Sequence, residues 1–364
     1  MIAVVGSGLM GAATAWQLAR GGHEVTLIEA YNPGHQHGSS HGSSRIFRRV
    51  YDDPFYIDLT GSAADAWKEL EGDTRTDLLR TTGGLDLGAQ RDPEHLAELL
   101  ATAGVPHELL TAEAASERWP GIRFTGPALY HPEAGVIDAD ATVAACVRRA
   151  TELGARVLPR VRIESVEPLG AARVLLRTEQ GGAIVADSVV VAAGPWLPEL
   201  GLPRSLTLPE LRVTQQQVFH FRQQDPEADW PTLVSQDDLS LYGLPSGSDG
   251  GPAPAFKLAE HNNGTPTTAR TRTGTPDADS RLRVSGFVRD RLPGLDPDPV
   301  GEATCLYTTT PDEDFVLDRR GPLVIVSPCS GHGAKFTPLI GAMAAALATG
   351  ESEPHPRFSL ARFD

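Results

Sequence analysis

The sequence predicts an α/β fold in which a buried parallel sheet opens the chain and a mostly antiparallel sheet follows later. Three observations lead to this expectation. The first 29 residues join two apolar runs through a glycine-rich turn and a helix pattern. Short β-branched runs return between residues 155 and 196. Beyond residue 211 the strand patterns alternate, as they do when one face of a sheet is covered.

The glycine-rich turn follows the apolar run IAVV at residues 2–5, which is typical of a strand buried on both faces. Its glycines have the spacing G-x-G-x-x-G: Gly6, Gly8 and Gly11. In a dinucleotide-binding βαβ unit they allow a tight turn, close approach of a pyrophosphate and close packing of helix on strand. Good helix formers fill residues 10–20, and a glycine pair at 21–22 ends the helix.

Glu29 ends the second apolar run, at residues 24–29, about 20 residues after the glycines. A carboxylate at this place grips the ribose hydroxyls of a dinucleotide and disfavours a 2′-phosphate. The order strand, glycines, helix, strand and acid therefore predicts a dinucleotide site. A βαβ unit that binds no nucleotide is the alternative.

Composition limits the partners and the compartment. The 364 residues, 40% of them hydrophobic, suffice for about two domains. With 32 Lys+Arg against 47 Asp+Glu the net charge is −15, which disfavours nucleic acid and anionic membranes as partners. No apolar run approaches the ~20 residues of a membrane span, and no leader pattern opens the chain. Three cysteines are too few for a disulfide framework, so we expect a cytoplasmic protein.

A loop of small polar residues at 32–44 follows Glu29 and turns basic at RIFRR, residues 45–49. Its three histidines, His35, His37 and His41, could suggest a metal site, but no cysteine or carboxylate lies among them. Small polar residues beside a dinucleotide more often hydrogen-bond phosphates. We therefore expect phosphate contacts from this loop and no metal.

The remaining elements follow from hydrophobic periodicity. Helices are expected at 53–70, 93–103, 111–119, 139–153, 281–291 and 337–348. Strands are expected at 79–87, 155–158, 161–166, 174–178, 183–185, 188–191, 305–308 and 323–326. Residues 247–254 and 262–277 are rich in turn formers and are expected to be surface loops. The departure from βαβ rhythm at 79–119 predicts a first passage through a second domain.

Six blocks, in order and at fixed spacing, identify a family resemblance. They are GSGLMG with Glu29, GSSHGSSRIFR at 38–48, VVVAAGPW at 189–196, KLAEH at 257–261, CLYTTTPDEDFVLD at 305–318 and SGHGAKF at 330–336. The chain resembles, nearly end to end, the monomeric sarcosine oxidase and N-methyltryptophan oxidase family, which belongs to the D-amino-acid oxidase superfamily.

The resemblance implies a discontinuous Rossmann-type FAD-binding domain and a second α+β substrate domain with a mostly antiparallel sheet. The FAD-binding domain would comprise residues 1–80, 139–212 and 301–364, and the substrate domain residues 81–138 and 213–300. The active site would lie between the two domains. The resemblance also implies a monomer.

The implied activity is FAD-dependent oxidation of a secondary amino acid, N-methyl or cyclic. Hydride would pass from the α-C–H to flavin N5, giving an imine, and oxygen would be reduced to hydrogen peroxide. A biosynthetic relative that oxidises ring amines is one alternative. A nicotinamide-dependent dehydrogenase and a non-catalytic dinucleotide-binding protein are less favoured, since neither would use the CLYT and SGHGAK blocks.

Cys305 opens the block in which the family cysteine carries the flavin through a thioether to its 8α-methyl carbon. A nearby cation would favour the thiolate that such an attachment needs. The alternative is a buried, inert cysteine. Cys146 and Cys329 are expected to be structural.

For the substrate carboxylate, the resemblance implies a clamp made by Arg48 and Lys335. In a site screened from water a carboxylate needs such paired cations. Arg45 matches the family arginine that lies over the flavin. Tyr242 and Tyr307 are expected to wall the pocket, with core packing as the alternative.

Lys257 matches the family lysine that holds a water near flavin N5 and promotes the reaction with oxygen, an electrostatic role. His261 matches an active-site histidine. The segment 247–255 is longer than in the family, so the register around Lys257 depends on it. Ser43 stands where sarcosine oxidases have an acid.

The predicted FAD contacts come from all parts of the chain. They are Gly6, Gly8, Leu9, Met10, Gly11, Glu29, Ser39, His41, Ser44, Arg45, Val161, Ala193, Gly194, Trp196, Cys305, Gly331, Gly333 and Lys335. Backbone N–H groups of the glycine turn at 331–333 would face the negative charge that develops on a reduced flavin.

Overall fold

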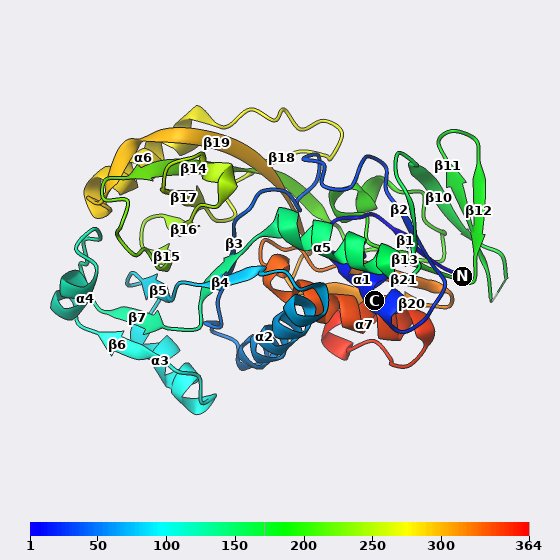
Figure 1. The fold of residues 1–364 in the computed structure, drawn as a ribbon, viewed down its shortest axis with the longest axis horizontal. Helices are drawn as coiled ribbons and strands as arrows, with labels where there is room; N and C mark the ends of the chain where they lie inside the picture. The colour runs from blue at the N-terminus through cyan, green and yellow to red at the C-terminus, as the bar shows by residue number, and fades with distance from the viewer. Residues whose placement is uncertain (171, 364) are drawn as a thin grey trace.

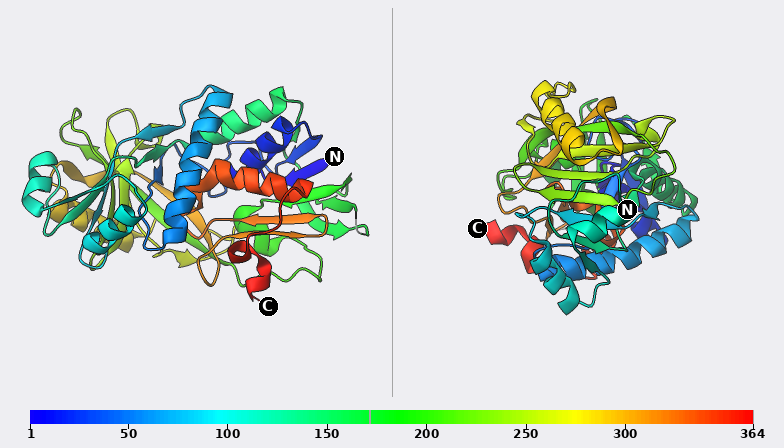
Figure 2. Two further views of the ribbon diagram at one scale, coloured as in Figure 1. Left: turned by 90° about the horizontal axis from the view of Figure 1, so that it is seen from below. Right: turned by 90° about the vertical axis from the view of Figure 1, so that its left-hand side faces the viewer.

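The computed structural model describes residues 1–170 and 172–363. A parallel sheet with its helices occupies one end of the molecule, and a large antiparallel sheet occupies the other (Figures 1 and 2). A small three-stranded sheet connects these two parts. The predicted α/β fold is therefore confirmed, and the cavity described below lies where the two parts meet.

The first sheet contains the strand that begins the chain. Its order is β20-β21-β13-β1-β2-β9, with bounds Val316–Arg320, Leu323–Ser327, Ser188–Val191, Ile2–Val5, Val25–Ile28 and Arg156–Leu158. Neighbouring strands are parallel except β20 and β21, which form an antiparallel edge. Because the carboxyl ends of parallel strands meet at one edge, residues from distant segments converge there.

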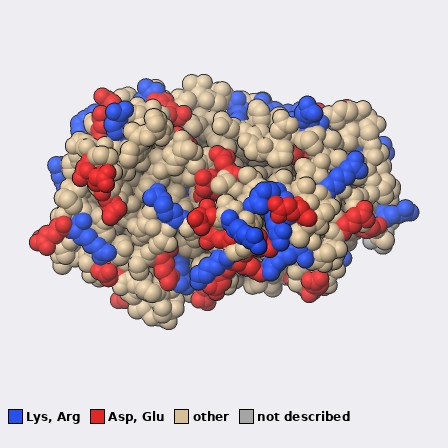
Figure 3. Space-filling model, viewed as in Figure 1, with Lys and Arg blue, Asp and Glu red and all other residues tan. Residues whose placement is uncertain are grey.

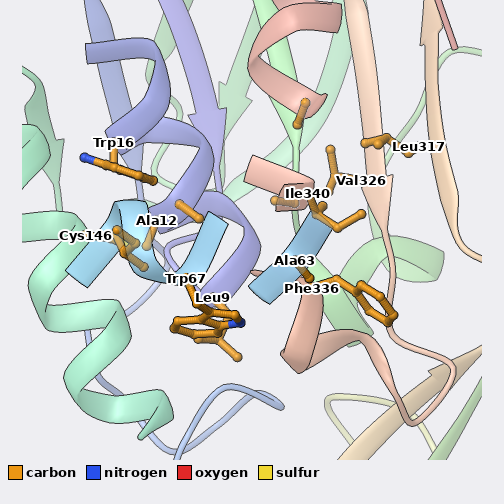
Figure 4. Close-up of a cluster of buried hydrophobic side chains, with 14 of the residues drawn as sticks. Leu9, Ala12, Trp16, Ala63, Trp67, Cys146, Leu317, Val326, Phe336 and Ile340 are labelled. Atoms are coloured by element: carbon orange, nitrogen blue, oxygen red, sulfur yellow. The ribbon is translucent and has the colours of Figure 1, made fainter. Parts of the chain in front are cut away.

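Four helices pack together over one face of this sheet. They are α1 Leu9–Arg20, α2 Pro54–Thr74, α5 Ala139–Glu152 and α7 Thr337–Thr349. Figure 4 shows their side chains meeting in one apolar cluster, including Trp16 of α1, Trp67 of α2 and Ile340 of α7. Trp67 also donates from Nε1 to the carbonyl of Lys335, 2.7 Å away, which ties α2 to the 3₁₀ turn η3, Gly333–Phe336.

The opposite face of the parallel sheet is covered by a second, smaller sheet. It has the order β10-β11-β12, with bounds Ile163–Pro168, Val174–Thr178 and Ala183–Ala186. All three strands are antiparallel to their neighbours. A second apolar cluster joins the two sheets, with Val189 and Ile325 from one and Leu176 from the other.

The large sheet has nine strands. Its order is β18-β14-β17-β16-β15-β5-β7-β6, with β19 paired to β14; the bounds are Thr265–Pro266, Arg212–Gln223, Ala255–Glu260, Ser240–Pro245, Thr232–Gln236, Gly84–Leu87, Ala128–His131, Glu108–Leu110 and, for β19, Leu295–Thr309. Only the pair β15 and β5 is parallel. Helix α6, Ala278–Arg291, packs on this sheet through a core that includes Phe219, Phe221 and Val284.

The connecting sheet consists of β3 Arg45–Phe47, β8 Gly135–Ile137 and β4 Leu79–Thr81, with β8 in the middle. Strand β3 contacts both β16 of the large sheet and the turn η3. The basic run that follows the polar loop is therefore held between the two halves of the molecule.

The prediction of one strand at 79–87 is wrong. The segment forms two strands in different sheets, β4 and β5, because the chain turns at Gly83, which has a φ of +70°. A Cβ at this glycine would also lie 2.5 Å from the ring of Tyr130. The backbone N–H groups of Thr82 and Gly83 both donate to the carbonyl of Ala134, which fixes the turn.

The helix boundaries differ from the predictions by a few residues, whereas β19 begins at Leu295, ten residues before the strand predicted at 305–308. Helix α2 extends to Thr74 and ends at Arg75, which has a left-handed φ of 51°. Helix α6 begins three residues early, because Asp277 caps it by accepting from the Asp279 N–H. The remaining helices include α3 Pro93–Thr102 and α4 Ala112–Arg118, as expected. In the described ranges no helix is both long and apolar enough to cross a membrane.

Figure 3 shows Lys, Arg, Asp and Glu side chains intermixed over one face of the molecule rather than gathered by sign. Many of them are paired, as in Arg149–Asp73 and Arg20–Glu69. Such exposed pairs contribute about 0–1 kcal/mol each.

Candidate active site

Every predicted site residue except Gly11 lines one cavity of about 1150 Å³. The cavity begins at the carboxyl edge of the parallel sheet and continues beneath the large antiparallel sheet. Gly11 lies behind its wall, in α1. A side chain there would place its Cβ 1.8 Å from the Gly6 carbonyl oxygen, so the helix can lie this close to β1 only without one.

The first turn suits a diphosphate. Gly6 has a φ of +99°, and a Cβ there would lie 2.4 Å from the carbonyl oxygen of Ala192. Gly8 caps α1 without any side-chain hydrogen bond, and the Leu9 N–H donates to Ser40 Oγ at 3.0 Å. The amino end of α1 therefore faces the cavity with its N–H groups, the arrangement that binds phosphate.

Glu29 is held as an ionised carboxylate beside this turn. It accepts from the N–H groups of Ser7 at 2.7 Å and Tyr31 at 2.9 Å, and His35 Nε2 lies 3.2 Å from its Oε1. Burial alone would raise the pKa of Glu29, but these hydrogen bonds, above all that with His35, bring it below its usual value. The backbone N–H of Val161 donates to the Glu29 carbonyl, which places that predicted contact beside it.

Rings surround this end of the cavity. Tyr31 stacks on His37 at 4.2 Å and lies 5.8 Å from Trp196, between ring centroids. The Arg162 guanidinium lies over the Tyr31 ring, with its Cζ 4.9 Å from the ring centroid. In the described ranges no group of three metal-binding side chains occurs.

Cys305 lies on β19, with its sulfur facing Arg45. Arg45 Nη2 is 4.0 Å from the Cys305 Sγ, and Arg45 also donates to the carbonyl groups of Ser44, at 2.8 Å, and Ser39, at 3.1 Å. The Cys305 side chain is partly exposed and lines the cavity. By contrast, burial raises the pKa of the Cys146 thiol to about 12, which fits an inert core residue.

Lys257, on β17, has a side chain that is 5% exposed and that reaches Ser44, at the end of the polar loop 32–44. Its Nζ donates to the carbonyl and the hydroxyl of Ser44, both at 3.1 Å, and lies 3.0 Å from Asp249 Oδ2. Burial and the charge of Arg45 together lower the pKa of Lys257 to about 8, although the nearby Asp249 carboxylate acts to raise it. Lys257 is therefore a buried, hydrogen-bonded amine in the cavity rather than a solvent-exposed surface charge.

The segment 247–254 is largely a surface loop, as predicted, with residues 248 and 251–254 exposed, but the Asp249 side chain is an exception. The segment contains the short turn η2, Ser248–Gly250, and it turns the Asp249 side chain inward. The carboxylate accepts from Ser43 Oγ at 2.9 Å and from Ser44 Oγ at 2.9 Å. A carboxylate from the segment 247–254 therefore lies beside Ser43 and Ser44.

Arg48 and Lys335 lie at the opposite end of the cavity, where both are buried. Lys335 Nζ donates to Tyr51 Oη at 2.9 Å and to the His332 carbonyl at 2.8 Å. Arg48 donates to the Val50 carbonyl and stacks over the Tyr51 ring at 4.7 Å. Burial and the neighbouring Arg48 hold the pKa of Lys335 well below its usual value. Among the described residues neither cation has an ion-pair partner.

Three rings lie near these two cations. His261 is 6.0 Å from Tyr307 and 6.4 Å from Tyr242, between ring centroids. Gly331 makes room for them, because a Cβ there would lie 2.6 Å from the Tyr307 ring. Burial and the nearby cations lower the pKa of His261 to about 4, so it is neutral near pH 7.

The family model described as FAD dependent oxidoreductase matches residues 1–347. The chain belongs to this family. It is 32% identical over 371 residues to the monomeric sarcosine oxidase of Bacillus sp. (strain B-0618), an alignment that covers 97% of this chain and 93% of that protein. It is also 32% identical over 383 residues to the N-methyl-L-tryptophan oxidase of Yersinia pestis (strain Pestoides F), covering 99% and 98%. The predicted resemblance is therefore confirmed.

A solved structure of similar fold is that of NikD, an unusual amino acid oxidase essential for nikkomycin biosynthesis, in its open form. It aligns with a TM-score of 0.87 and 26% identity, over 98% of this chain and 96% of that one. The fold of this FAD dependent oxidoreductase is therefore that of known amino acid oxidases.

The cavity fits FAD on two further observations. Ser7 Oγ and His41 Nε2 are buried, line the cavity and have no hydrogen-bond partner among the described residues. A bound dinucleotide would offer partners to both, and buried polar groups require them. The glycine turn and Glu29 would hold the diphosphate and the ribose, and Cys305, Arg45 and Lys257 would face the ring system.

Sequence reasoning missed four residues of this site: Tyr51, Asp249, Arg91 and His332. His332 lies inside the block SGHGAKF, and Tyr51 lies three residues after Arg48, so nearness in sequence to the predicted cations was an available signal. The other two lie on loops whose direction no periodicity reveals.

Proposed function

We propose that this FAD dependent oxidoreductase oxidises the CH–NH group of a secondary amino acid, N-methyl or cyclic, and passes the electrons to oxygen to give hydrogen peroxide. The observation that carries the proposal is the pair of cations Arg48 and Lys335, which line the cavity and form no ion pair with any described residue. A buried charge is costly until it is compensated. The carboxylate of an amino acid is the compensating group that such a site requires.

In this proposal Arg48 and Lys335 bind the substrate carboxylate, and Tyr51 orients both of them through its hydroxyl and its ring. The rings of Tyr242 and Tyr307 exclude water around the carbon and nitrogen that react. His261 is neutral at pH 7 and adds no charge that would repel an ammonium group. When bound, FAD would supply the acceptor for the two electrons that leave the CH–NH group as it becomes an imine.

Lys257 acts in the return of electrons to oxygen. Its ammonium group is buried beside Arg45 and Cys305, and it stabilises the negative charge that develops on oxygen as it is reduced. This role needs the charged form of Lys257. Asp249 maintains that form, because its carboxylate opposes the effects of burial and of Arg45 on the pKa of the lysine.

We further propose that Cys305 carries the flavin as an 8α thioether. Forming this bond removes one hydrogen from the sulfur and one from the methyl group, and oxygen takes up the corresponding two electrons. Support comes from the position of the thiol in the cavity, its distance of 4.0 Å from Arg45 Nη2 and the family block in which it stands.

The proposal is tested by measuring peroxide release from the purified holoenzyme with sarcosine, N-methyl amino acids, proline and pipecolate. We expect peroxide with at least one of them, in a reaction that consumes one oxygen per peroxide. Peroxide with none of them, or oxidation that requires added nicotinamide cofactor, would contradict the proposal. The cytoplasmic location and the monomeric state stay predictions.

A further inference from the structure

Arg91 is a buried cation that the proposed reaction does not use. It lies between β5 and α3, lines the cavity, and its side chain is 9% exposed. Its Nε donates to Asp86 Oδ1 at 2.6 Å, and Asp86, on β5, is 1% exposed. The Nη2 of Arg91 is buried and has no partner among the described residues.

Arg91 and Arg48 line the same part of the cavity, close enough for their charges to interact. The charge of Arg91 lowers the pKa of Arg48, and with Arg48 and Lys335 it lowers that of His261. Asp86 compensates Arg91 through one N–H only, which leaves the other donors of its guanidinium unused by the protein. A planar guanidinium fixed in this way by an acid is prepared to bind a carboxylate.

The charges at this end exceed what one carboxylate can compensate. Among the described residues, the cations in this part of the cavity are Arg48, Arg91 and Lys335, and the buried carboxylate near Arg48 and Arg91 is that of Asp86. The other acid near Arg48, Asp52, is exposed to solvent, where its charge is screened. A substrate with a single carboxylate would leave one buried positive charge without a partner.

We propose that Arg91 is a second anion-binding position, and that the substrate is a secondary amino acid with an additional acidic group, such as an N-methylated acidic amino acid. The inference rests on the proposed function, because it assigns the α-carboxylate to Arg48 and Lys335. Arg91 contacts the additional acidic group, and Asp86 is a positioning residue that fixes the guanidinium.

A purely structural role for the Asp86–Arg91 pair is the rival explanation. It predicts that removing Arg91 affects stability but does not discriminate between ligands with one and two carboxylates. The two explanations therefore differ in a binding measurement that needs no turnover.

The test compares butyrate with succinate, which replaces the terminal methyl group of butyrate by a carboxylate. Both are titrated calorimetrically into the holoenzyme at a pH where succinate is a dianion. We expect succinate to bind roughly 10- to 100-fold more tightly, as a charge-assisted hydrogen bond predicts. In Arg91→Gln this preference is lost, while the affinity for butyrate changes less than about threefold. Equal binding of the two acids to the wild type, or a preference that survives in Arg91→Gln, overturns the proposal.

A double variant that removes both charges of the Asp86–Arg91 pair controls for a folding defect. The double variant D86N/R91Q leaves no unpaired buried carboxylate, and it should lose the preference for succinate as the single variant does. If neither variant folds, the wild-type enzyme alone tests the inference. The measurement is then kcat/KM for N-methyl-L-glutamate compared with kcat/KM for its isosteric amide, N-methyl-L-glutamine. Preference for the glutamate supports the inference, and equal or reversed values overturn it.

The outcomes separate this inference from the proposed function. Oxidation of N-methyl-L-glutamine without preference for the acid overturns the second anion position and leaves the oxidase intact. Tighter binding of succinate without oxidation of any secondary amino acid overturns the oxidase and leaves the anion position.

Discussion

Asp249 Oδ2 lies 3.0 Å from Lys257 Nζ, in a cavity where Lys257 and Arg45 would otherwise be adjacent cations. The same carboxylate accepts hydrogen bonds from Ser43 and Ser44, so its position is fixed from three sides. These bonds and the charge of Lys257 overcome the effect of burial and hold the pKa of Asp249 well below its usual value. The pair is therefore ionised across the neutral range.

Replacing Asp249 by Asn should change the pH dependence of the reaction with oxygen. Burial and Arg45 already lower the pKa of Lys257 to about 8, and the loss of the carboxylate would lower it further. The active ammonium form is present below this pKa and is lost as the pH rises through it. We therefore expect the fall in the reoxidation rate of the reduced enzyme, followed by stopped flow, to move to lower pH in Asp249→Asn.

Asp65→Asn is the matched control, because Asp65 is an exposed acid paired with Lys68 on α2. It should leave the profile unchanged. A profile in Asp249→Asn identical to that of the wild type would show that Asp249 does not hold the charge of Lys257.

Replacing Arg48 by Gln should weaken carboxylate binding. Arg48 has no acidic partner among the described residues, and a charge-assisted hydrogen bond contributes about 1.5–3 kcal/mol. The dissociation constant of butyrate, measured by calorimetry, should rise roughly 10- to 100-fold. Arg148→Gln, at a half-exposed arginine of α5, should have no effect. An unchanged constant in Arg48→Gln would remove this residue from the carboxylate site.

Cys305→Ser should release the flavin. After acid denaturation, yellow colour and flavin fluorescence should stay with the wild-type polypeptide and appear in the supernatant of the variant. Cys329→Ser is the control, since the sulfur of Cys329 accepts from the Thr308 N–H and burial raises the pKa of its thiol. Colour that washes out of the wild type would contradict the covalent attachment.

Gly11→Ala and Gly72→Ala should have opposite effects, although both glycines lie inside helices. A Cβ at Gly11 would meet the Gly6 carbonyl oxygen at 1.8 Å, so this variant should lose FAD and unfold at lower temperature. Nothing lies within 4 Å of a Cβ at Gly72, so alanine there should stabilise the protein by about 0.5–1 kcal/mol. Thermal unfolding and flavin content check both expectations. A Gly11→Ala variant that keeps its flavin would contradict the role of the turn.

The parts of the fold that were predictable depend on local patterns. The run from β1 to Glu29 forms one continuous unit, so glycine spacing and hydrophobic periodicity identified it. The two strands within 79–87 were merged, because the turn at Gly83 interrupts no apolar pattern and is fixed by contacts with Tyr130 and Ala134. The conformation of a single glycine is not encoded in periodicity.

The candidate site was predictable where a block of sequence carries it, as for Cys305 and Lys335. Asp249 and Arg91 were missed because each acts through a partner whose position depends on the folded chain. Asp249 meets Ser43, 206 residues away, and Arg91 turns back from its loop to Asp86. Composition predicted that the segment 247–254, which contains Asp249, is a surface loop, since six of its eight residues are glycine, serine or proline. Only tertiary contacts turn the Asp249 side chain inward.

Anaerobic mixing of the holoenzyme with secondary amino acids tests the central claim most directly. The account predicts that at least one of them bleaches the flavin absorbance in a single turnover, without any nicotinamide cofactor. Readmitted oxygen should then restore the absorbance and yield one hydrogen peroxide per flavin. A flavin that no secondary amino acid bleaches, or that only a reduced nicotinamide bleaches, would contradict it.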